Sequence, residues 1–156
     1  MKDKKKILAL IMLIAWMVIV FILSGDIATE STEKSDYFVN ATLNIFNFEN
    51  TLKIVGLITY YVRKSAHLIL YLIGGICIYN YLFRIENKYI KRNCYIFSIV
   101  FGAIYAISDE LHQAFVPGRS CMIQDMCIDT VGCFLGVCIM YLFFKIATNK
   151  KRKAEK

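Results

Sequence analysis

The sequence predicts an all-α integral membrane protein: a four-transmembrane-helix bundle with an amphipathic helix at its outer interface. Hydrophobic residues make up 58% of the 156 residues, and the mean hydropathy is +0.51. A soluble domain of this size is less apolar. Four apolar runs, at about 7–23, 65–83, 94–113 and 122–144, are each long enough to cross a bilayer. We expect one membrane domain over residues 7–146 and a basic cytoplasmic tail at 147–156.

The first apolar run follows a basic leader and has two interpretations. Four lysines among the first six residues precede an uninterrupted apolar stretch of 17 residues at 7–23. A leader and run of this kind also begin a secretory signal peptide. The run is longer than a usual signal-peptide core, and the residues 24–27 make a poor cleavage site. We therefore expect a retained first transmembrane helix.

The segment 25–51 is polar and acidic. Within it Asp36, Asn40, Asn44 and Asn47 recur at helical spacing, and apolar residues fill the remaining faces. This pattern predicts a short amphipathic helix that lies on the membrane surface. An ordinary helix within a loop fits the pattern equally well.

The remaining spans are separated by charge and by a turn. Residues 52–62 are apolar, but Arg63 and Lys64 interrupt them, so we expect the second span to begin near residue 65. A basic loop at 84–93 precedes the third span. Between the third and fourth spans, Pro117 and Gly118 fit the central pair of a type II turn, because proline presets φ and glycine accepts a positive φ. That turn would present Arg119 between two helix ends.

The charges divide the chain into two sides. Of the 19 Lys and Arg residues, 14 lie in the leader, the 84–93 loop and the tail, whereas 9 of the 12 acidic residues lie on the other side. The positive-inside rule then predicts a multi-pass protein of the cell membrane with both termini in the cytoplasm. The net charge of +7 is accounted for by anionic lipid at the cytoplasmic side, so we expect membrane lipids and no nucleic acid as partners.

The six cysteines do not suggest a metal site. None has the CxxC spacing of a metal-binding pair, and almost all lie inside apolar runs. A bridge between Cys121 and Cys127 is a minor alternative. A histidine beside carboxylates also resembles a metal site. Because only one histidine lies deep in the predicted site, we favour a site without a metal ion. We expect no cofactor.

Polar residues from three spans are predicted to meet at one depth. With a rise of about 1.5 Å per residue, His67, Asp109 and Asp129 lie roughly 22–24 Å above the inner ends of their spans. That is the outer third of a ~30 Å hydrocarbon core. They also share helix faces with other polar residues. The three stripes are Lys64, His67 and Tyr71; Asp109 and Gln113, with Glu110 one position round; and Asp125 and Asp129 followed by Gly132 and Gly136.

These residues could form structural charge pairs or a functional site. Four carboxylates face two bases and one imidazole, which is more polarity than packing needs. Burying charge without full pairing costs several kcal/mol for each group. We therefore favour a functional site, in which Gly132 and Gly136 let another helix approach closely.

Several of these residues also carry a resemblance to a known family. The run of residues 64–71 resembles the K-x-x-H-x-x-x-Y signature of the VanZ-like family. Residues 109–132 resemble its second signature, D-E-x-x-Q followed by G-R, D and N-x-x-G. Ser24, Ser31 and Ser35 are similar to its serine-rich segment after the first helix. The resemblance covers roughly residues 7–145, with one departure: Asp129 stands where the family is expected to carry Asn.

The resemblance implies a small bacterial envelope protein whose founding relative is linked to low-level resistance to teicoplanin. We expect it to act at the outer leaflet on or with a lipid or lipid-linked cell-wall precursor, lowering glycopeptide susceptibility. The alternatives are a membrane-embedded hydrolase or transferase acting on a phospholipid headgroup, and a small ion-coupled transporter. The candidate catalytic residues are His67, Asp109 and Glu110, and the candidate substrate-binding residues are Lys64, Tyr71, Gln113, Arg119, Asp125 and Asp129.

Overall fold

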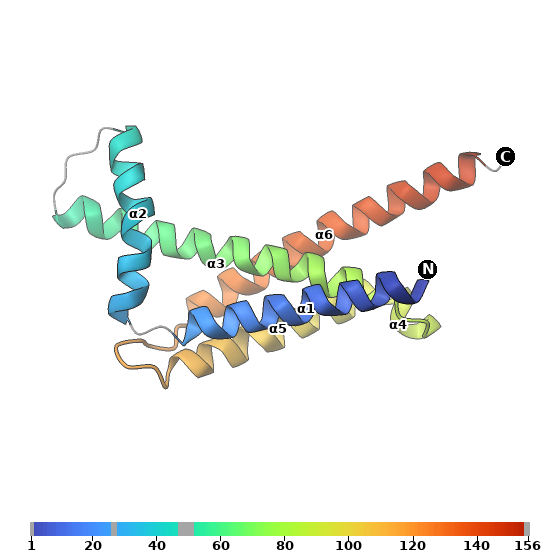
Figure 1. Ribbon diagram of the computed structural model, residues 1–156, viewed down its shortest axis with the longest axis horizontal. Coiled ribbons are helices and arrows are strands. Elements are labelled where there is room, and N and C mark those ends of the chain that lie inside the picture. The colour runs from blue at the N-terminus through green and yellow to red at the C-terminus, as the bar shows by residue number, and fades with distance from the viewer. Residues whose placement is uncertain (1, 26–27, 47–51, 155–156) are drawn as a thin grey trace.

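The computed structural model describes residues 2–25, 28–46 and 52–154, and its regular structure over these ranges is entirely helical. Four helices, α1, α3, α5 and α6, are long and apolar enough to cross a membrane. The predicted all-α membrane fold is therefore confirmed. The helices in chain order are α1 (Lys2–Ser24), α2 (Ala28–Phe46), α3 (Leu52–Leu82), α4 (Lys88–Arg92), α5 (Cys94–Gln113) and α6 (Ile123–Ala154) (Figure 1).

The bundle has two distinct ends. In Figure 1, α1, α3 and α5 run alongside one another, and α6 crosses them and continues beyond the bundle. The end of α1, the end of α5 and the beginning of α6 lie at one end, where α2 crosses the bundle axis. The beginning of α1, the short α4 and the end of α6 lie toward the other end. Both ends of the chain thus lie toward the same end of the bundle. That this end faces the cytoplasm stays a prediction.

The sequence predicted that Arg63 and Lys64 interrupt the segment before the second span, but they do not interrupt the helix. Helix α3 runs without a break from Leu52 to Leu82, and α6 likewise continues through the basic tail to Ala154. Lysine and arginine are good helix formers, so their charge ends an apolar run without ending a helix. The extra turns of α3 carry Arg63 and Lys64 into the candidate site.

Helix α2 matches the amphipathic segment predicted from the spacing of polar residues. Val39 and Leu43 are buried, and the helix packs against α3. Tyr37, Phe38 and Ile45 are exposed. Helix α2 therefore has one face on the bundle and carries apolar side chains on its exposed surface as well. The predicted last polar position, residue 47, lies outside the described residues.

Helices α3 and α6 pack backbone against backbone. A Cβ atom at Gly136 would lie 2.0 Å from the carbonyl oxygen of Leu72, and one at Gly132 would lie 2.4 Å from the carbonyl oxygen of Leu68. Both distances are shorter than any real contact of a Cβ atom. The close approach predicted for these two glycines is therefore confirmed, and it brings the polar stripes of α3 and α6 together.

Helix α1 is held in register by aromatic side chains. The indole Nε1 of Trp16 donates to the carbonyl oxygen of Leu70 at 2.8 Å, and its ring occupies the space where Gly74 has no side chain. The hydroxyl of Tyr105 in α5 donates to the carbonyl oxygen of Met17 at 2.7 Å. These contacts place Ser24, the last residue of α1, at the candidate site.

Candidate functional site

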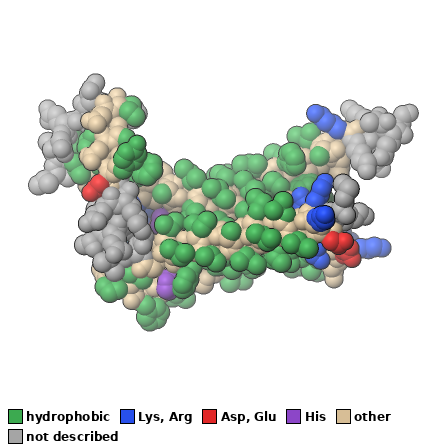
Figure 2. All heavy atoms as spheres, in the orientation of Figure 1, with side chains coloured by type: hydrophobic (Ala, Val, Ile, Leu, Met, Phe, Trp, Pro, Cys, Tyr) green, Lys and Arg blue, Asp and Glu red, His purple; other side chains and the backbone are tan. Residues whose placement is uncertain are grey.

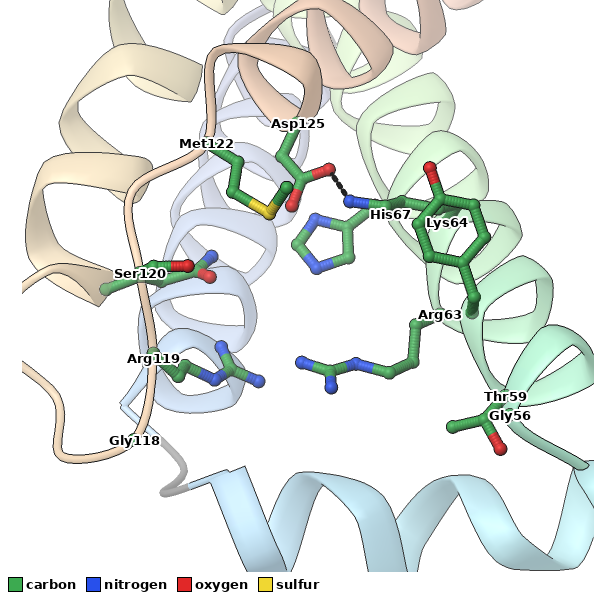
Figure 3. Close-up of a pocket in the computed structure, with 12 residues that line it drawn as sticks. Gly56, Thr59, Arg63, Lys64, His67, Gly118, Arg119, Ser120, Met122 and Asp125 are labelled. Carbon is green, nitrogen blue, oxygen red and sulfur yellow. Dashed lines mark hydrogen bonds and ion pairs between the residues drawn. The ribbon is translucent and has the colours of Figure 1, made fainter. Parts of the chain in front are cut away.

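A cavity of about 380 Å³ lies at the end of the bundle where α1 and α5 end and α6 begins. Arg63, Lys64 and His67 of α3 line one side of it. Arg119 of the turn and Asp125 of α6 line the other side (Figure 3). Its volume falls in the range of small-molecule sites, about 300–1,000 Å³.

The turn that carries Arg119 has the predicted type II geometry. Gly118 has a φ of 79°, and the amide of Arg119 donates to the carbonyl oxygen of Val116 at 3.1 Å. Glycine adopts that φ without strain. The guanidinium of Arg119 also donates from Nη1 to the carbonyl oxygen of Ser24 at 3.4 Å, which ties the turn to the end of α1.

Two guanidinium groups meet across the cavity. Figure 3 shows the side chains of Arg63 and Arg119 directed toward each other from opposite walls, with the His67 imidazole beside them. Arg63 was not among the predicted site residues. Its position four residues before His67 puts it on the same helical face, and that spacing is the signal that sequence reasoning missed.

Lys64 and Asp125 form an ion pair that joins α3 to α6. The Lys64 ammonium also lies 5.2 Å from the centre of the Tyr60 ring. The Tyr60 hydroxyl accepts a hydrogen bond from Gln124 Nε2 at 2.7 Å, which makes a second link between the same two helices. The positive charge of Lys64 is therefore already paired with a carboxylate of the protein.

His67 stands between the cavity and a buried carboxylate. Its Nδ1 is 3.3 Å from Oδ1 of Asp129, whose side chain is completely buried. Neither atom completes a hydrogen bond within the described residues, so the pair is close but not aligned. Since Nδ1 is buried on the Asp129 side, Nε2 is the ring nitrogen left for the cavity.

Asp109 is directed toward α1. It accepts a hydrogen bond from the hydroxyl of Ser24 and another from Nε2 of Gln113, the latter at 3.3 Å from Oδ2. All three side chains are buried. Ser24 thus has a definite partner, whereas the side chains of the other two serines in the predicted serine-rich segment lie outside what the structure describes.

Glu110 has no exposed surface and holds the beginning of α6. Its Oε2 accepts a hydrogen bond from the backbone amide of Met122 at 2.9 Å. The two adjacent carboxylates of α5 therefore serve different neighbours: Asp109 contacts α1, and Glu110 contacts the residue before α6. Neither side chain lines the cavity.

Tyr71 lies behind the cavity, in the core. Its ring packs edge-on against Trp16 with centroids 5.6 Å apart, and the side chain has no exposed surface. Its hydroxyl finds no hydrogen-bond partner among the described residues. The candidate residues thus form two layers. Lys64, His67, Gln113, Arg119 and Asp125 line the cavity, and Tyr71, Asp109, Glu110 and Asp129 are buried around it.

The arrangement of potential metal ligands and of cysteines is defined in the part of the chain that the structure describes. There, no group of three or more His, Cys, Asp or Glu side chains is arranged to hold a metal ion. All six cysteines, Cys121 and Cys127 included, are free thiols.

Together these features define a helical membrane protein with a basic cavity at one end and buried carboxylates around it. The chain belongs to the VanZ/LLP1 family: residues 9–144 match the model of that family. No curated protein and no solved structure matches the chain.

Proposed function

We propose that the cavity binds the phosphate of a lipid or lipid-linked cell-wall precursor at the outer leaflet. One observation carries this proposal: Arg63 and Arg119 come from different elements and direct their guanidinium groups toward each other across the cavity (Figure 3). An anion between two guanidinium groups is attracted to both of them. The planar fork of arginine donors suits the oxygens of a phosphate group.

The location of the cavity favours a ligand that stays in the membrane. The lining residues lie where α5 ends and α6 begins, so a headgroup in the cavity would have its lipid chain beside exposed apolar helix surface. Lys64 is paired with Asp125. We therefore assign the phosphate to the guanidinium groups of Arg63 and Arg119, whose planar forks suit its oxygens better than an ammonium group does. A bound wall precursor would be less accessible to a glycopeptide, and we propose lowered susceptibility to teicoplanin-type antibiotics as the physiological result.

A second candidate function is hydrolysis or transfer at a phospholipid headgroup. The observation that favours it is the position of His67, which lines the cavity and has the buried Asp129 at 3.3 Å from Nδ1. A carboxylate this close to one ring nitrogen stabilises the protonated form of the imidazole. His67 Nε2 would then accept a proton from an attacking water or hydroxyl group.

The test uses purified protein, radiolabelled phosphatidylglycerol and a radiolabelled polyprenyl-diphosphate-linked wall precursor. We expect the wild-type protein to retain at least one of the two labelled lipids. Arg63→Gln and Arg119→Gln should each weaken retention by roughly tenfold, the loss of about one charge-assisted hydrogen bond. Lys53→Gln is the matched control, because Lys53 is an exposed cation on α3 outside the cavity lining.

The outcomes separate the two functions. Retention without turnover that survives His67→Ala supports a binding protein. Turnover that His67→Ala abolishes while retention persists supports the enzyme. If the wild-type protein retains neither lipid, or if the arginine variants bind as the wild type does, the proposal fails.

A further inference from the structure

Gly56 is a glycine of α3 that neither packing nor backbone conformation explains. It lies inside the helix, which runs from Leu52 to Leu82, and glycine destabilises a helix relative to alanine. A Cβ atom at this position would have no described atom within 4 Å. At the other helical glycines of the described residues, an added Cβ would lie only 2.0–2.4 Å from an atom of another helix: Gly74, Gly75, Gly102, Gly132 and Gly136. Gly56 therefore leaves open a space that no described part of the chain fills.

The space at Gly56 belongs to the cavity. Gly56, Thr59 and Arg63 line it from α3, and their spacing of three and then four residues puts them on one face of the helix. With a rise of about 1.5 Å per residue, Gly56 lies roughly 10 Å along the helix from Arg63. Figure 3 shows Gly56 and Thr59 on the far side of Arg63 from His67. The cavity therefore continues beyond the guanidinium group of Arg63, along the first turns of α3.

The cavity is larger than a phosphate group needs. Its volume of about 380 Å³ is within the range of sites that hold whole small molecules. The chain of a bound lipid has a better place outside the cavity, because hydrophobic side chains cover much of the helix surface (Figure 2). The volume that the phosphate leaves is therefore available to the group attached to it.

The charges in the cavity disfavour a cationic group beside the phosphate. Arg63, Lys64 and Arg119 line it. Asp125 is the carboxylate among the described lining residues, and it is paired with Lys64. The ring of Tyr60 could attract an ammonium group, but it already lies 5.2 Å from the ammonium of Lys64. A group attached to a phosphate in this cavity should therefore be uncharged.

Uncharged polar side chains in the lining have hydrogen-bonding capacity left. The hydroxyl of Thr59 donates to the carbonyl oxygen of Val55 at 2.9 Å, so its oxygen can still accept a hydrogen bond. The hydroxyl of Ser120 forms no hydrogen bond with any residue that the structure describes, so it can both donate and accept. The hydroxyl groups of a polyol or a sugar are also donors and acceptors, and they match these two side chains.

We propose that Gly56 determines the headgroup specificity of the cavity, by leaving room for an uncharged, hydroxyl-bearing group, a polyol or a sugar, attached to the bound phosphate. The inference rests on the phosphate binding proposed for Arg63 and Arg119, and it adds the part of the ligand beyond the phosphate. A larger side chain at position 56 would occupy that room. The guanidinium group of Arg63, about two helical turns away, would stay in place.

The experiment measures lipid binding to the purified full-length protein by native mass spectrometry. Phosphatidylmethanol, phosphatidylglycerol and phosphatidylethanolamine share a phosphodiester and differ in the attached group, which is a methyl group, a polyol or an amine. A polyprenyl-diphosphate-linked wall precursor supplies sugars. We expect the wild type to bind phosphatidylglycerol, the precursor or both more tightly than phosphatidylmethanol and phosphatidylethanolamine. The preference should be roughly threefold or more, the effect of at least one hydrogen bond between neutral groups.

Variants at position 56 test the assignment to this residue. Gly56→Leu should weaken binding of the preferred lipid by roughly tenfold through a steric clash and leave phosphatidylmethanol binding unchanged. Gly56→Ala should cause a smaller loss of the same kind, roughly threefold, and it remains informative if Gly56→Leu is unstable in thermal unfolding. Ala66→Leu is the matched control, because Ala66 is exposed on α3 outside the cavity lining.

The results distinguish failure of this inference from failure of the proposed function. A loss confined to phosphatidylglycerol identifies the attached group as a polyol, and a loss confined to the precursor identifies it as a sugar. Wild-type affinities in folded position-56 variants, an equal loss for phosphatidylmethanol, or no preference over phosphatidylmethanol in the wild type would overturn the inference and leave phosphate binding intact. If the wild type binds none of the four lipids, the proposed function fails and the inference fails with it.

Discussion

Removing the carboxylate of Glu110 should release the turn that carries Arg119. The Glu110 side chain is completely buried, and its Oε2 accepts the amide proton of Met122, the residue before α6. Helix α6 and the 114–122 turn are thus fastened to α5 by a side chain that does not touch the cavity. Glu110→Ala removes the acceptor, whereas Glu110→Gln keeps a carbonyl oxygen at nearly the same place.

The size of the effect follows from this one contact. A hydrogen bond to a charged group contributes about 1.5–3 kcal/mol, and leaving a buried donor unpaired costs a similar amount. We expect Glu110→Ala to lower the free energy of unfolding by about 2–3 kcal/mol. Glu110→Gln should lose about 1 kcal/mol or less, because an amide oxygen still accepts from the Met122 amide but without the charge.

Hydrogen exchange measures the contact directly and requires no ligand. In a peptide covering residues 115–123, Glu110→Ala should accelerate exchange by roughly 30- to 150-fold if opening becomes easier by the same free energy. Glu110→Gln should exchange nearly as slowly as the wild type. Glu86→Ala is the control, since Glu86 is an exposed carboxylate at the other end of the bundle.

Two results would refute this reasoning. Unchanged exchange in Glu110→Ala would mean that the Met122 amide is protected by something else. Loss of function in Glu110→Gln together with wild-type exchange would mean that the acid itself takes part in chemistry, as the sequence had suggested for Glu110.

Three further predictions concern packing, topology and the site. Gly136→Ala should destabilise the bundle by about 1–3 kcal/mol in a thermal or denaturant assay, because its new Cβ would lie 2.0 Å from a backbone oxygen of α3, whereas Gly56→Ala, with nothing within 4 Å, should not. In a cysteine-free chain, a single cysteine at position 33 should react with an impermeant thiol reagent on intact cells, and one at position 86 should not. Labelling of position 86 alone would reverse the predicted topology. His67→Ala should leave membrane abundance unchanged while abolishing glycopeptide protection; its disappearance from the membrane would indicate a purely structural role.

The parts of the site that could be predicted are those that follow from helical periodicity and local turn chemistry. Lys64 and His67 are three residues apart, and Asp125 and Asp129 are four apart, so each pair lies on one face of its helix. The structure brings Lys64 to Asp125 and His67 to Asp129. The Pro-Gly sequence likewise determines the turn, because the required φ of Gly118 is a local property. Both predictions needed only the helical repeat and the residue types.

The parts that could not be predicted depend on which helix faces which. Asp109 and Glu110 are neighbours in the sequence, so they point about 100° apart around α5, a consequence of 3.6 residues per turn. Which neighbour each one meets is decided by packing, and they meet α1 and the beginning of α6. Arg63 was read as the end of an apolar run because hydropathy registers its charge and not its helix-forming tendency.

The contacts of α1 have a consequence for biosynthesis. The partner of the Trp16 indole lies 54 residues later in the chain, and the partner of the Ser24 hydroxyl lies 85 residues later. The ribosome therefore delivers the first helix to the membrane well before the groups that satisfy its polar atoms exist. Until α5 follows, the end of α1 must rely on water, lipid headgroups or an insertion factor for those hydrogen bonds. A nascent chain stopped before residue 109 should consequently be unstable in the membrane. The cavity forms only in the last stage of assembly.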